Sequence, residues 1–185
     1  MAMRVRQEVK SAIVDLQNEL SGRVSGTALR MVRERNLHIT LHFLGNQPSA
    51  RPLVEALESI RHDPVDLEVR GCGYFPSLRR PRVLWVGITD ASGGLAEIHA
   101  RLARSLEARS LPVERRPFRP HITVAYVRKG IRPHEIRSLA EATRPMVDES
   151  IGHFRAEVIE LLNSHTGPGG SVYSEVAHVR LSEDG

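Results

Sequence analysis

The sequence Leu37-His38-Ile39-Thr40-Leu41 returns later in the chain as Pro120-His121-Ile122-Thr123-Val124. Both stretches carry β-branched residues at their centres, which favours strands, and a helical pattern follows each of them. Side chains of a strand alternate between its two faces, so the His and the Thr of each stretch share one face. The repetition indicates an internal duplication in which two imidazoles, each beside a hydroxyl, lie across one cleft.

Two opposed histidines are suited to the chemistry of phosphodiesters. A neutral imidazole takes a proton from the attacking oxygen, while an imidazolium gives a proton to the leaving oxygen. The ordinary histidine pKa, about 6.5, allows both forms near neutral pH. Beside His38 and His121, the hydroxyls of Thr40 and Thr123 are then expected to donate hydrogen bonds to the non-bridging phosphate oxygens.

Apolar periodicity elsewhere predicts a mixed order of helices and strands. This order predicts an α+β fold, in a single domain over 1–185 whose duplicated motifs lie at 38–41 and 121–124. No low-complexity linker divides the chain, so two lobes would have to be interleaved. We expect helices at 9–20, 52–60, 95–106 and 136–140, strands at 37–44, 67–74, 83–88 (antiparallel to 67–74), 121–127, 154–162 and 172–181, and a turn at 166–170.

The composition excludes several classes of protein. The 185 residues are 41% hydrophobic and 26% charged, with a mean hydropathy of −0.27, which fits neither a membrane protein nor a disordered tail. No apolar run approaches the roughly 20 residues that span a bilayer, and the first residues lack the apolar run of a signal peptide. Cys72 is the only cysteine, so no internal disulfide is expected and a cytoplasmic location is the default.

The basic residues are almost all arginine, because only Lys10 and Lys129 are lysine. Arginine matches phosphate with a planar fork, which favours a polyanionic partner, although a GC-rich genome would also explain the total. Position is more informative, since every charged residue from Arg115 to Arg132 is basic. Within this segment Arg119, Arg128 and Lys129 are candidates for contacts to an RNA backbone.

A metal site is the alternative interpretation of His38 and His42, which are four residues apart. On a strand this spacing separates the side chains by roughly 13 Å, too far for one ion. Carboxylates are absent from 36–54 and from 115–134, so the usual oxygen ligands are not nearby. We therefore expect no metal, and we expect His42 at the cleft edge or in solvent.

Other catalytic chemistries have weaker support. Cys72 could be an exposed thiol, but a small residue in a packed strand is the better interpretation. The chain has no nucleophile elbow, Walker loop or dinucleotide fingerprint. For the remaining histidines we expect surface or packing roles without paired partners; these are His62, His99, His134, His153, His165 and His178.

The duplicated motifs resemble those of the 2H phosphoesterase superfamily, and the surrounding residues are similar to its branch of RNA 2',3'-cyclic phosphodiesterases, also called 2'-5' RNA ligases. The resemblance covers the chain from about Asn36 onward, and the combination is specific although each piece alone is not. The matching segments are 36–45, 73–76, 81–85, 116–123 and 162–164, together with Tyr173.

The resemblance implies two similar lobes of antiparallel sheet, flanked by helices, around a central cleft. It implies hydrolysis of 2',3'-cyclic phosphate ends of RNA to 2'-phosphomonoesters, without metal or other cofactor. His38 would be the proton donor to the leaving 3'-oxygen, and His121 the proton acceptor that activates water. The substrate's negative charge would help to keep His38 protonated. The reverse reaction, with a 5'-hydroxyl in place of water, would join RNA ends.

The chain departs from the family pattern at two places. Members usually begin with a hydrophobic strand, whereas 1–6 is too short and too charged to supply one. Loss of that strand would weaken the sheet, and dimerisation could compensate, although a monomer is the default expectation. The second motif commonly continues into an arginine where this chain has Tyr126, and Arg128 could substitute only if the strand ends early.

Two alternatives to this activity remain open on the sequence. The chain could be a catalytically idle module that binds RNA ends through the same cleft and arginines. It could also be a 2H esterase for a small cyclic nucleotide or an ADP-ribose cyclic phosphate.

Overall fold

The computed structural model describes residues 1–24, 28–167 and 170–182, and within them nine strands form one antiparallel sheet. The strand order is β7-β4-β5-β6-β3-β1-β8-β9, and β2 also pairs with β6. The expected α+β class is therefore confirmed. The strands are β1 (Ala2–Arg4), β2 (Leu29–Met31), β3 (His38–Thr40), β4 (Val65–Phe75), β5 (Val83–Thr89), β6 (His121–Val127), β7 (Ser150–Ala156), β8 (Val158–Gly167) and β9 (Gly170–Arg180). The helices are α1 (Gln7–Arg23), α2 (Arg51–Glu58), α3 (Gly94–Glu107) and α4 (Pro133–Thr143), with 3-10 turns at Glu34–Asn36 and Arg144–Met146.

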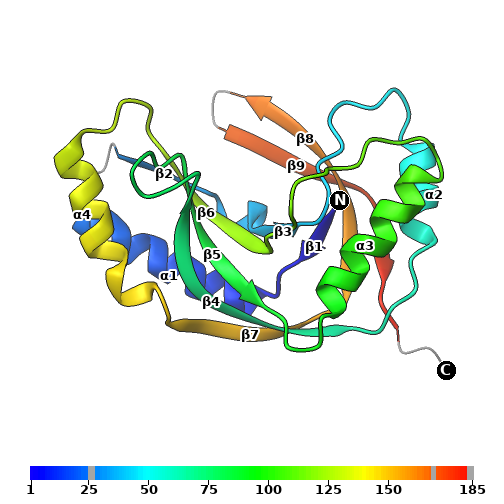
Figure 1. The fold of residues 1–185 in the computed structure, drawn as a ribbon, viewed down its shortest axis with the longest axis horizontal. Helices are drawn as coiled ribbons and strands as arrows, with labels where there is room; N and C mark the ends of the chain where they lie inside the picture. The colour runs from blue at the N-terminus through cyan, green and yellow to red at the C-terminus, as the bar shows by residue number, and fades with distance from the viewer. Residues whose placement is uncertain (25–27, 168–169, 183–185) are drawn as a thin grey trace.

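The helices pack at the two ends of this sheet, and β3 and β6 lie between them (Figure 1). At one end α1 packs against β6, β7 and α4. At the other end α2 packs against β8, β9 and α3. The chain crosses between the two halves several times, so neither half is a continuous segment. No helix in the described part of the chain is long and apolar enough to cross a membrane.

The two motif strands are neighbours in the sheet. β3 and β6 run antiparallel, with Ile39 opposite Ile122. Both isoleucine side chains are fully buried, and each contributes about 1.5–3 kcal/mol to folding by leaving water. Because side chains alternate, burial of the two isoleucines turns the His and Thr of both motifs to the opposite face.

The first residues form a central strand, and the expectation that they would supply none is wrong. β1 lies between β3 and β8, with Met3 opposite both Ile39 and Ile159. Alternation explains why so short a segment suffices. Met1, Met3 and Val5 are buried in the core, while Arg4 on the other face donates hydrogen bonds to the carboxylates of Glu160 (2.7 Å) and Glu175 (2.8 Å).

Two expected strands have different bounds in the structure. The strand expected at 37–44 ends at Thr40, after which the chain leaves the sheet for the loop before α2. The strand expected at 154–162 is two strands, because β7 ends at Ala156 and β8 begins at Val158. These two strands lie in opposite halves of the sheet. Of the turn expected at 166–170, residues 168–169 lie outside the described part of the chain.

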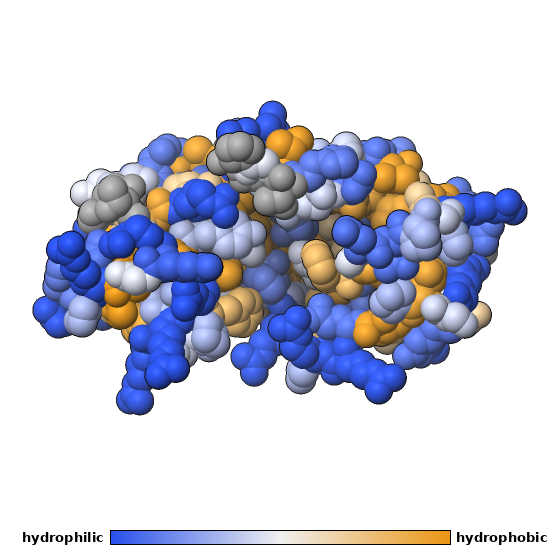
Figure 2. Space-filling model, turned by 90° about the horizontal axis from the view of Figure 1, so that it is seen from above, coloured by the Kyte–Doolittle hydropathy of each residue, from blue (hydrophilic) through white to orange (hydrophobic). Residues whose placement is uncertain are grey.

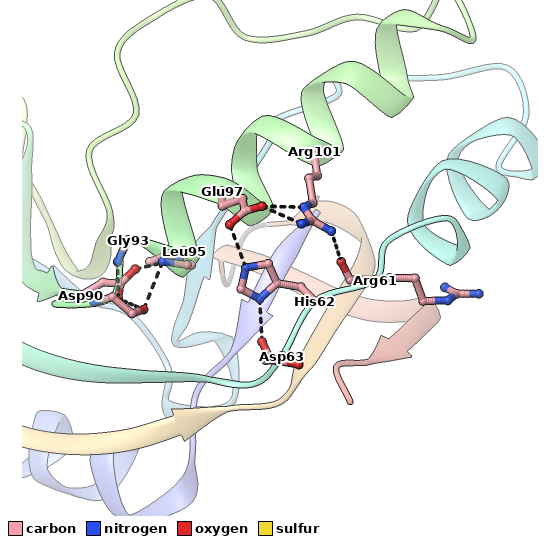
Figure 3. A network of polar contacts seen from close by, with 10 residues as sticks. Arg61, His62, Asp63, Asp90, Gly93, Leu95, Glu97 and Arg101 are labelled. Carbon is pink, nitrogen blue, oxygen red and sulfur yellow. Dashed lines mark hydrogen bonds and ion pairs between the residues drawn. The ribbon is translucent and has the colours of Figure 1, made fainter. Parts of the chain in front are cut away.

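A polar network fixes the start of α3 and ties the helix to the segment before β4 (Figure 3). The Asp90 carboxylate accepts hydrogen bonds from the backbone N–H groups of Gly93 (3.1 Å) and Leu95 (2.7 Å), which otherwise lack helical partners. Glu97 pairs with Arg101 at 2.6 Å, and Arg101 donates to the carbonyl of Arg61 at 2.6 Å. The network therefore adds polar contacts to the apolar face of α3, where Leu95, Ile98, Leu102 and Leu106 are buried in the core.

Gly73 makes room for the only tryptophan of the chain. Gly73 of β4 lies opposite Trp85 of β5, and a Cβ at position 73 would lie 2.3 Å from the indole ring. The indole can therefore lie over the β4 backbone, where it contacts the rings of Phe75 and His121. A glycine in this strand thus positions an aromatic wall beside the second motif.

Substitution Gly73→Ala is expected to displace the Trp85 ring, because the added methyl group has no space. The expected cost is about 1–3 kcal/mol of the free energy of unfolding, as for other overpacked sites. Urea unfolding measures this cost, and the fluorescence of the single tryptophan reports the displacement. The matched control is Gly22→Ala in α1, where nothing lies within 4 Å of the added Cβ and a gain of up to about 1 kcal/mol is expected. Equal stabilities of the two variants would contradict this account.

Candidate functional site: two histidines on one face of the sheet

The antiparallel register brings the four motif residues together. With Ile39 opposite Ile122, residue 38 lies opposite 123 and residue 40 lies opposite 121. Directly opposed residues of neighbouring strands have Cβ atoms about 4.5–5.5 Å apart and point to the same side. His38 and His121 lie on the diagonal of this group, at a typical spacing of about 7–8 Å. One phosphate group fits between two such imidazoles.

Each imidazole is held by the same backbone contact. His38 Nδ1 donates a hydrogen bond to the carbonyl of Asn36, and His121 Nδ1 donates to the carbonyl of Arg119, both at 2.7 Å. A carbonyl only accepts, so Nδ1 carries the proton in both rings. The Nε2 atoms are therefore the ones that can exchange a proton with a substrate. His38 Nε2 also lies 3.1 Å from the hydroxyl of Thr40.

An aromatic ring contacts the edge of each imidazole. Tyr173 of β9 lies 5.0 Å from the His38 ring, at an angle of 77° between the ring planes. Phe75 of β4 lies 4.9 Å from the His121 ring, at 79°. Such edge-to-face contacts restrict ring rotation, so both imidazoles are positioned before any ligand arrives.

The two imidazoles differ in their surroundings. Burial lowers the pKa of His38 below its ordinary value of 6.5, because the charged ring loses water, although the hydrogen bond to the Asn36 carbonyl opposes this effect. The positive charges of the N-terminal amine, Lys10 and a protonated His121 act in the same direction as burial. An anion placed between the rings would reverse these repulsions and favour the charged form of His38.

Two pockets lie on the face that carries the motifs. Figure 2 shows a hollow near the middle of the molecule. The smaller pocket, which we call the His38 pocket, has a volume of about 110 Å³ and is lined by Arg30, Arg33, Asn36, His38, Thr40, Thr123, Tyr126, Ser171 and Tyr173, with the segment at 31–32. The larger, the His121 pocket, has a volume of about 600 Å³ and is lined by residues of 40–41, 75–76, 82–83, 114 and 116–119, with His99 and His121. Thr40 lies at the border of both, so the two pockets meet at the motif residues.

A β-bulge turns Tyr126 into the His38 pocket. β5 pairs Leu84 with Ala125 but Trp85 with Thr123, so Val124 is an extra residue of β6. Gln17 of α1 stabilises this bulge, because its Nε2 donates a hydrogen bond of 2.9 Å to the Val124 carbonyl. Without the extra residue, strict alternation would turn position 126 away from the face that carries the motifs.

Arg30 shares the His38 pocket with Tyr126, and no pattern in the sequence indicated it. The two residues are opposite each other on β2 and β6, and the Arg30 guanidinium lies 4.6 Å above the centre of the Tyr126 ring. The family pattern commonly places an arginine at position 126. Here the strand pairing brings a guanidinium to the same pocket from β2 instead.

Comparison with known proteins identifies the family of this chain. The model of the 2'-5' RNA ligase superfamily matches residues 7–168. The chain belongs to this superfamily.

Two relatives and one solved structure illustrate its place in the 2'-5' RNA ligase superfamily. The RNA 2',3'-cyclic phosphodiesterase of Aeropyrum pernix is 34% identical over 163 residues, which cover 87% of this chain and 91% of the relative. The protein of the same name from Aquifex aeolicus is 28% identical over 158 residues, covering 82% and 81%. The crystal structure of TT0787 of Thermus thermophilus matches with a TM-score of 0.79 at 24% identity, covering 99% of this chain and 97% of that one. The structural match supports the fold alone.

The three basic residues that were expected to contact an RNA backbone lie in different surroundings. Arg119 lines the His121 pocket. Arg128 lines neither pocket, because its guanidinium donates to both carboxylate oxygens of Glu135, at 3.0 and 3.1 Å. Lys129 is exposed in the turn after β6 and also lines neither pocket. The structure therefore brings one of the three to the motifs.

His42 is buried, and the expectation of a cleft-edge or solvated residue is wrong. Only 1% of it is exposed, and its Nε2 donates a hydrogen bond of 2.9 Å to the carbonyl of His99. The chain leaves β3 after Thr40, so the alternation that predicted a shared face with His38 no longer applies. The His42 ring instead stacks on the His99 ring, with centroids 4.1 Å apart and an angle of 16°.

Several other histidines have partners, which contradicts the expectation that they have none. His62 lies 3.5 Å from Glu97, His153 lies 3.6 Å from Glu68, and His178 Nδ1 lies 2.6 Å from Glu175. These pairs lie outside the two pockets, as the expected surface or packing roles require. His99 is the exception, because it lines the His121 pocket.

The Cys72 thiol of β4 is half-buried, and burial raises its pKa to about 11, which disfavours the reactive thiolate. In the described part of the chain, no group of three or more His, Cys, Asp or Glu side chains is placed to hold a metal ion.

Acid is expected to destabilise the fold, because burial favours the neutral forms of three histidines, His38, His42 and His99. Burial lowers the pKa of His99 from 6.5 to about 4 and also lowers the pKa of His38 and His42. Between these values the unfolded chain binds more protons than the folded chain, so the free energy of unfolding falls as the pH drops from about 6.5 toward 4. Urea titrations across this window measure the slope. His99→Phe keeps a stacked ring without its titration and should flatten the slope, and an unchanged slope would contradict the assignment.

Proposed function

We propose that this protein hydrolyses 2',3'-cyclic phosphate ends of RNA to 2'-phosphomonoesters, using His38 and His121 as acid and base. The observation that carries the proposal is the pairing of β3 with β6, which sets two imidazoles and two hydroxyls around one phosphate-sized space. The printed name of the Aeropyrum pernix relative, RNA 2',3'-cyclic phosphodiesterase, supports the same substrate class. We infer that the two halves of the sheet act as one bilobal domain over 1–185, because each half supplies one histidine.

In the proposed reaction His121 acts first. Its Nε2, with the proton held on Nδ1 by the Arg119 carbonyl, removes a proton from water. The water oxygen attacks phosphorus in line with the bond from phosphorus to the 3'-oxygen, and that bond breaks. The protonated Nε2 of His38 then donates its proton to the departing 3'-oxygen, which leaves a 2'-phosphate and a 3'-hydroxyl.

The charge of the substrate sets the protonation state that His38 needs. In the free protein burial lowers its pKa, so the neutral form is favoured at neutral pH. The cyclic phosphate is an anion, and its approach stabilises the imidazolium. Thr40 and Thr123 are proposed to donate their hydroxyl hydrogens to the non-bridging oxygens, where negative charge increases in the transition state. The general acid is thus charged when the substrate is bound.

No step of this mechanism uses a metal ion, and both histidines come from one chain, so no second copy is needed. The microscopic reverse, with a 5'-hydroxyl of RNA in place of water, would join two ends through a 2'-5' linkage.

A cytoplasmic location fits a single cysteine and an RNA substrate. Arg119 in the His121 pocket is the proposed contact to the RNA backbone nearest to His121.

Replacing either catalytic candidate by alanine is expected to lower kcat by roughly 10²–10⁴, the usual contribution of one acid or base. The assay is turnover of an oligonucleotide that ends in a 2',3'-cyclic phosphate, measured with and without EDTA. His134→Ala, an exposed histidine on α4, is the matched control and should retain full activity.

The outcomes of this assay separate the candidate functions. Undiminished turnover in His38→Ala or His121→Ala would reject the mechanism, and loss of turnover on chelation would reject metal independence. Salt-sensitive binding of the RNA end without product would indicate the idle binding module. A mononucleotide cyclic phosphate that turns over far better than the oligonucleotide would indicate a small-molecule esterase.

Arg30 is expected to bind the phosphate-bearing end from the His38 pocket. Arg30→Gln should raise KM several-fold and change kcat less, because the guanidinium binds charge that is present before the reaction. It should also lower the slope of log KM against log salt by roughly 0.7, the value for one contact to a single strand. The control is Arg137→Gln on α4, which lines neither pocket. Equal salt slopes for both variants would place the RNA elsewhere.

A further inference from the structure

The wall of the His121 pocket contains a column of stacked rings that the proposed mechanism does not use. His99 lies between His42 and Phe118, with centroid distances of 4.1 Å on both sides and angles of 16° and 12° between the ring planes. His42 is buried at the inner end of the column. Phe118 is half-buried at the other end, and both His99 and Phe118 line the pocket. Both faces of His99 are thus covered, and the ring of the column that is left to offer a face to the pocket is that of Phe118.

This column is uncharged near neutral pH. Burial lowers the pKa of His99 to about 4, and the repulsion between His99 and His42 acts in the same direction. A neutral stacked surface suits the flat face of a nucleobase, because stacking on aromatic side chains is a general means of holding unpaired bases.

The two pockets differ in a way that assigns the base to one of them. The His121 pocket has a volume of about 600 Å³, and Leu41, Phe75 and Pro76 line it together with polar residues. The His38 pocket has a volume of about 110 Å³ and is lined mainly by polar and charged side chains. A nucleobase is large and flat with apolar faces, so only the His121 pocket fits it.

Glu114 supplies the polar group that the same pocket offers to the edge of a base. It lines the pocket, and its negative charge raises the pKa of both His42 and His99, which places it near the column. Its partner Arg116, at 2.7 Å, has a side chain that is 88% exposed. The Glu114 side chain is 30% exposed, and because the Arg116 guanidinium stays in water the ion pair is weak, so a ligand can replace it at little cost. The carboxylate is therefore available as a pair of hydrogen-bond acceptors.

We propose that the His121 pocket binds the terminal base of the RNA and that Glu114 makes guanine the preferred base. This inference rests on the proposed function. Guanine presents two adjacent donors, N1–H and the N2 amino group, which match the two oxygens of a carboxylate. Adenine and cytosine place a ring acceptor beside their amino group, and uracil places a single N–H between two carbonyls, so each would turn a lone pair toward Glu114. Arg116 can donate to the guanine O6 from the same side.

The test compares four oligonucleotides that differ only in the nucleotide carrying the 2',3'-cyclic phosphate. We expect kcat/KM for the guanosine end to exceed that for the uridine end by roughly tenfold, which is the scale of one bidentate contact to a base. Glu114→Gln should reduce this preference to about twofold or less. His99→Ala should lower kcat/KM for all four ends while leaving their ratio unchanged. Glu141→Gln, an exposed carboxylate on α4, is the matched control and should behave as the parent protein.

Equal turnover of the four ends, or a guanosine preference that survives Glu114→Gln, would overturn the inference and leave the proposed function standing. If no end is hydrolysed, the proposed function fails, and calorimetric titration with the four nucleoside 2'-monophosphates decides the inference. Tighter binding of 2'-GMP that is lost in Glu114→Gln would support the base site in a non-catalytic protein. Equal affinities would overturn both.

Discussion

The antiparallel contact between Ile39 and Ile122 is the constraint on which the rest of the structure depends. Hydrophobic burial of these two side chains fixes the face of each strand, since a slip by one residue would move every side chain to the other face. The same register sets each histidine opposite the threonine of the other motif. Four polar residues that are far apart in the sequence thus become neighbours, without any direct bond between the two histidines.

The surroundings of the motif strands hold this arrangement in place. Met3 of β1 packs between Ile39 and Ile159, so the strand that looked too short for the sheet closes its centre. On the other side, Gln17 of α1 donates a second hydrogen bond to the Val124 carbonyl at the bulge, which also accepts one from the backbone N–H of Val32. Backbone carbonyls then orient both imidazoles by the same Nδ1 contact. The fold therefore preorganises both imidazoles before any ligand arrives.

The two motifs are alike in sequence but not in environment. The His38 pocket is small and polar, with Arg30 and Tyr126 on its wall, whereas the His121 pocket is large and has the stacked rings of His99 and Phe118. A duplicated pair of strands therefore leads to two unequal sides. Under the proposed function, this inequality would give an RNA end a single direction of binding, with its terminal base in the larger pocket.

The sequence by itself determined the α+β class, most of the helices and strands, and the pairing of a His with a Thr on one face of each motif strand. These follow from local periodicity, and periodicity is a property of neighbouring residues. Only the tertiary structure decided that His42 turns inward to stack on His99, that Tyr126 turns toward the cleft after a bulge, and that Arg30 joins it from β2. Each of these depends on a contact between residues distant in sequence, or on one extra residue that breaks the alternation. Burial and strand register, which no single segment encodes, therefore completed the site that the motifs began.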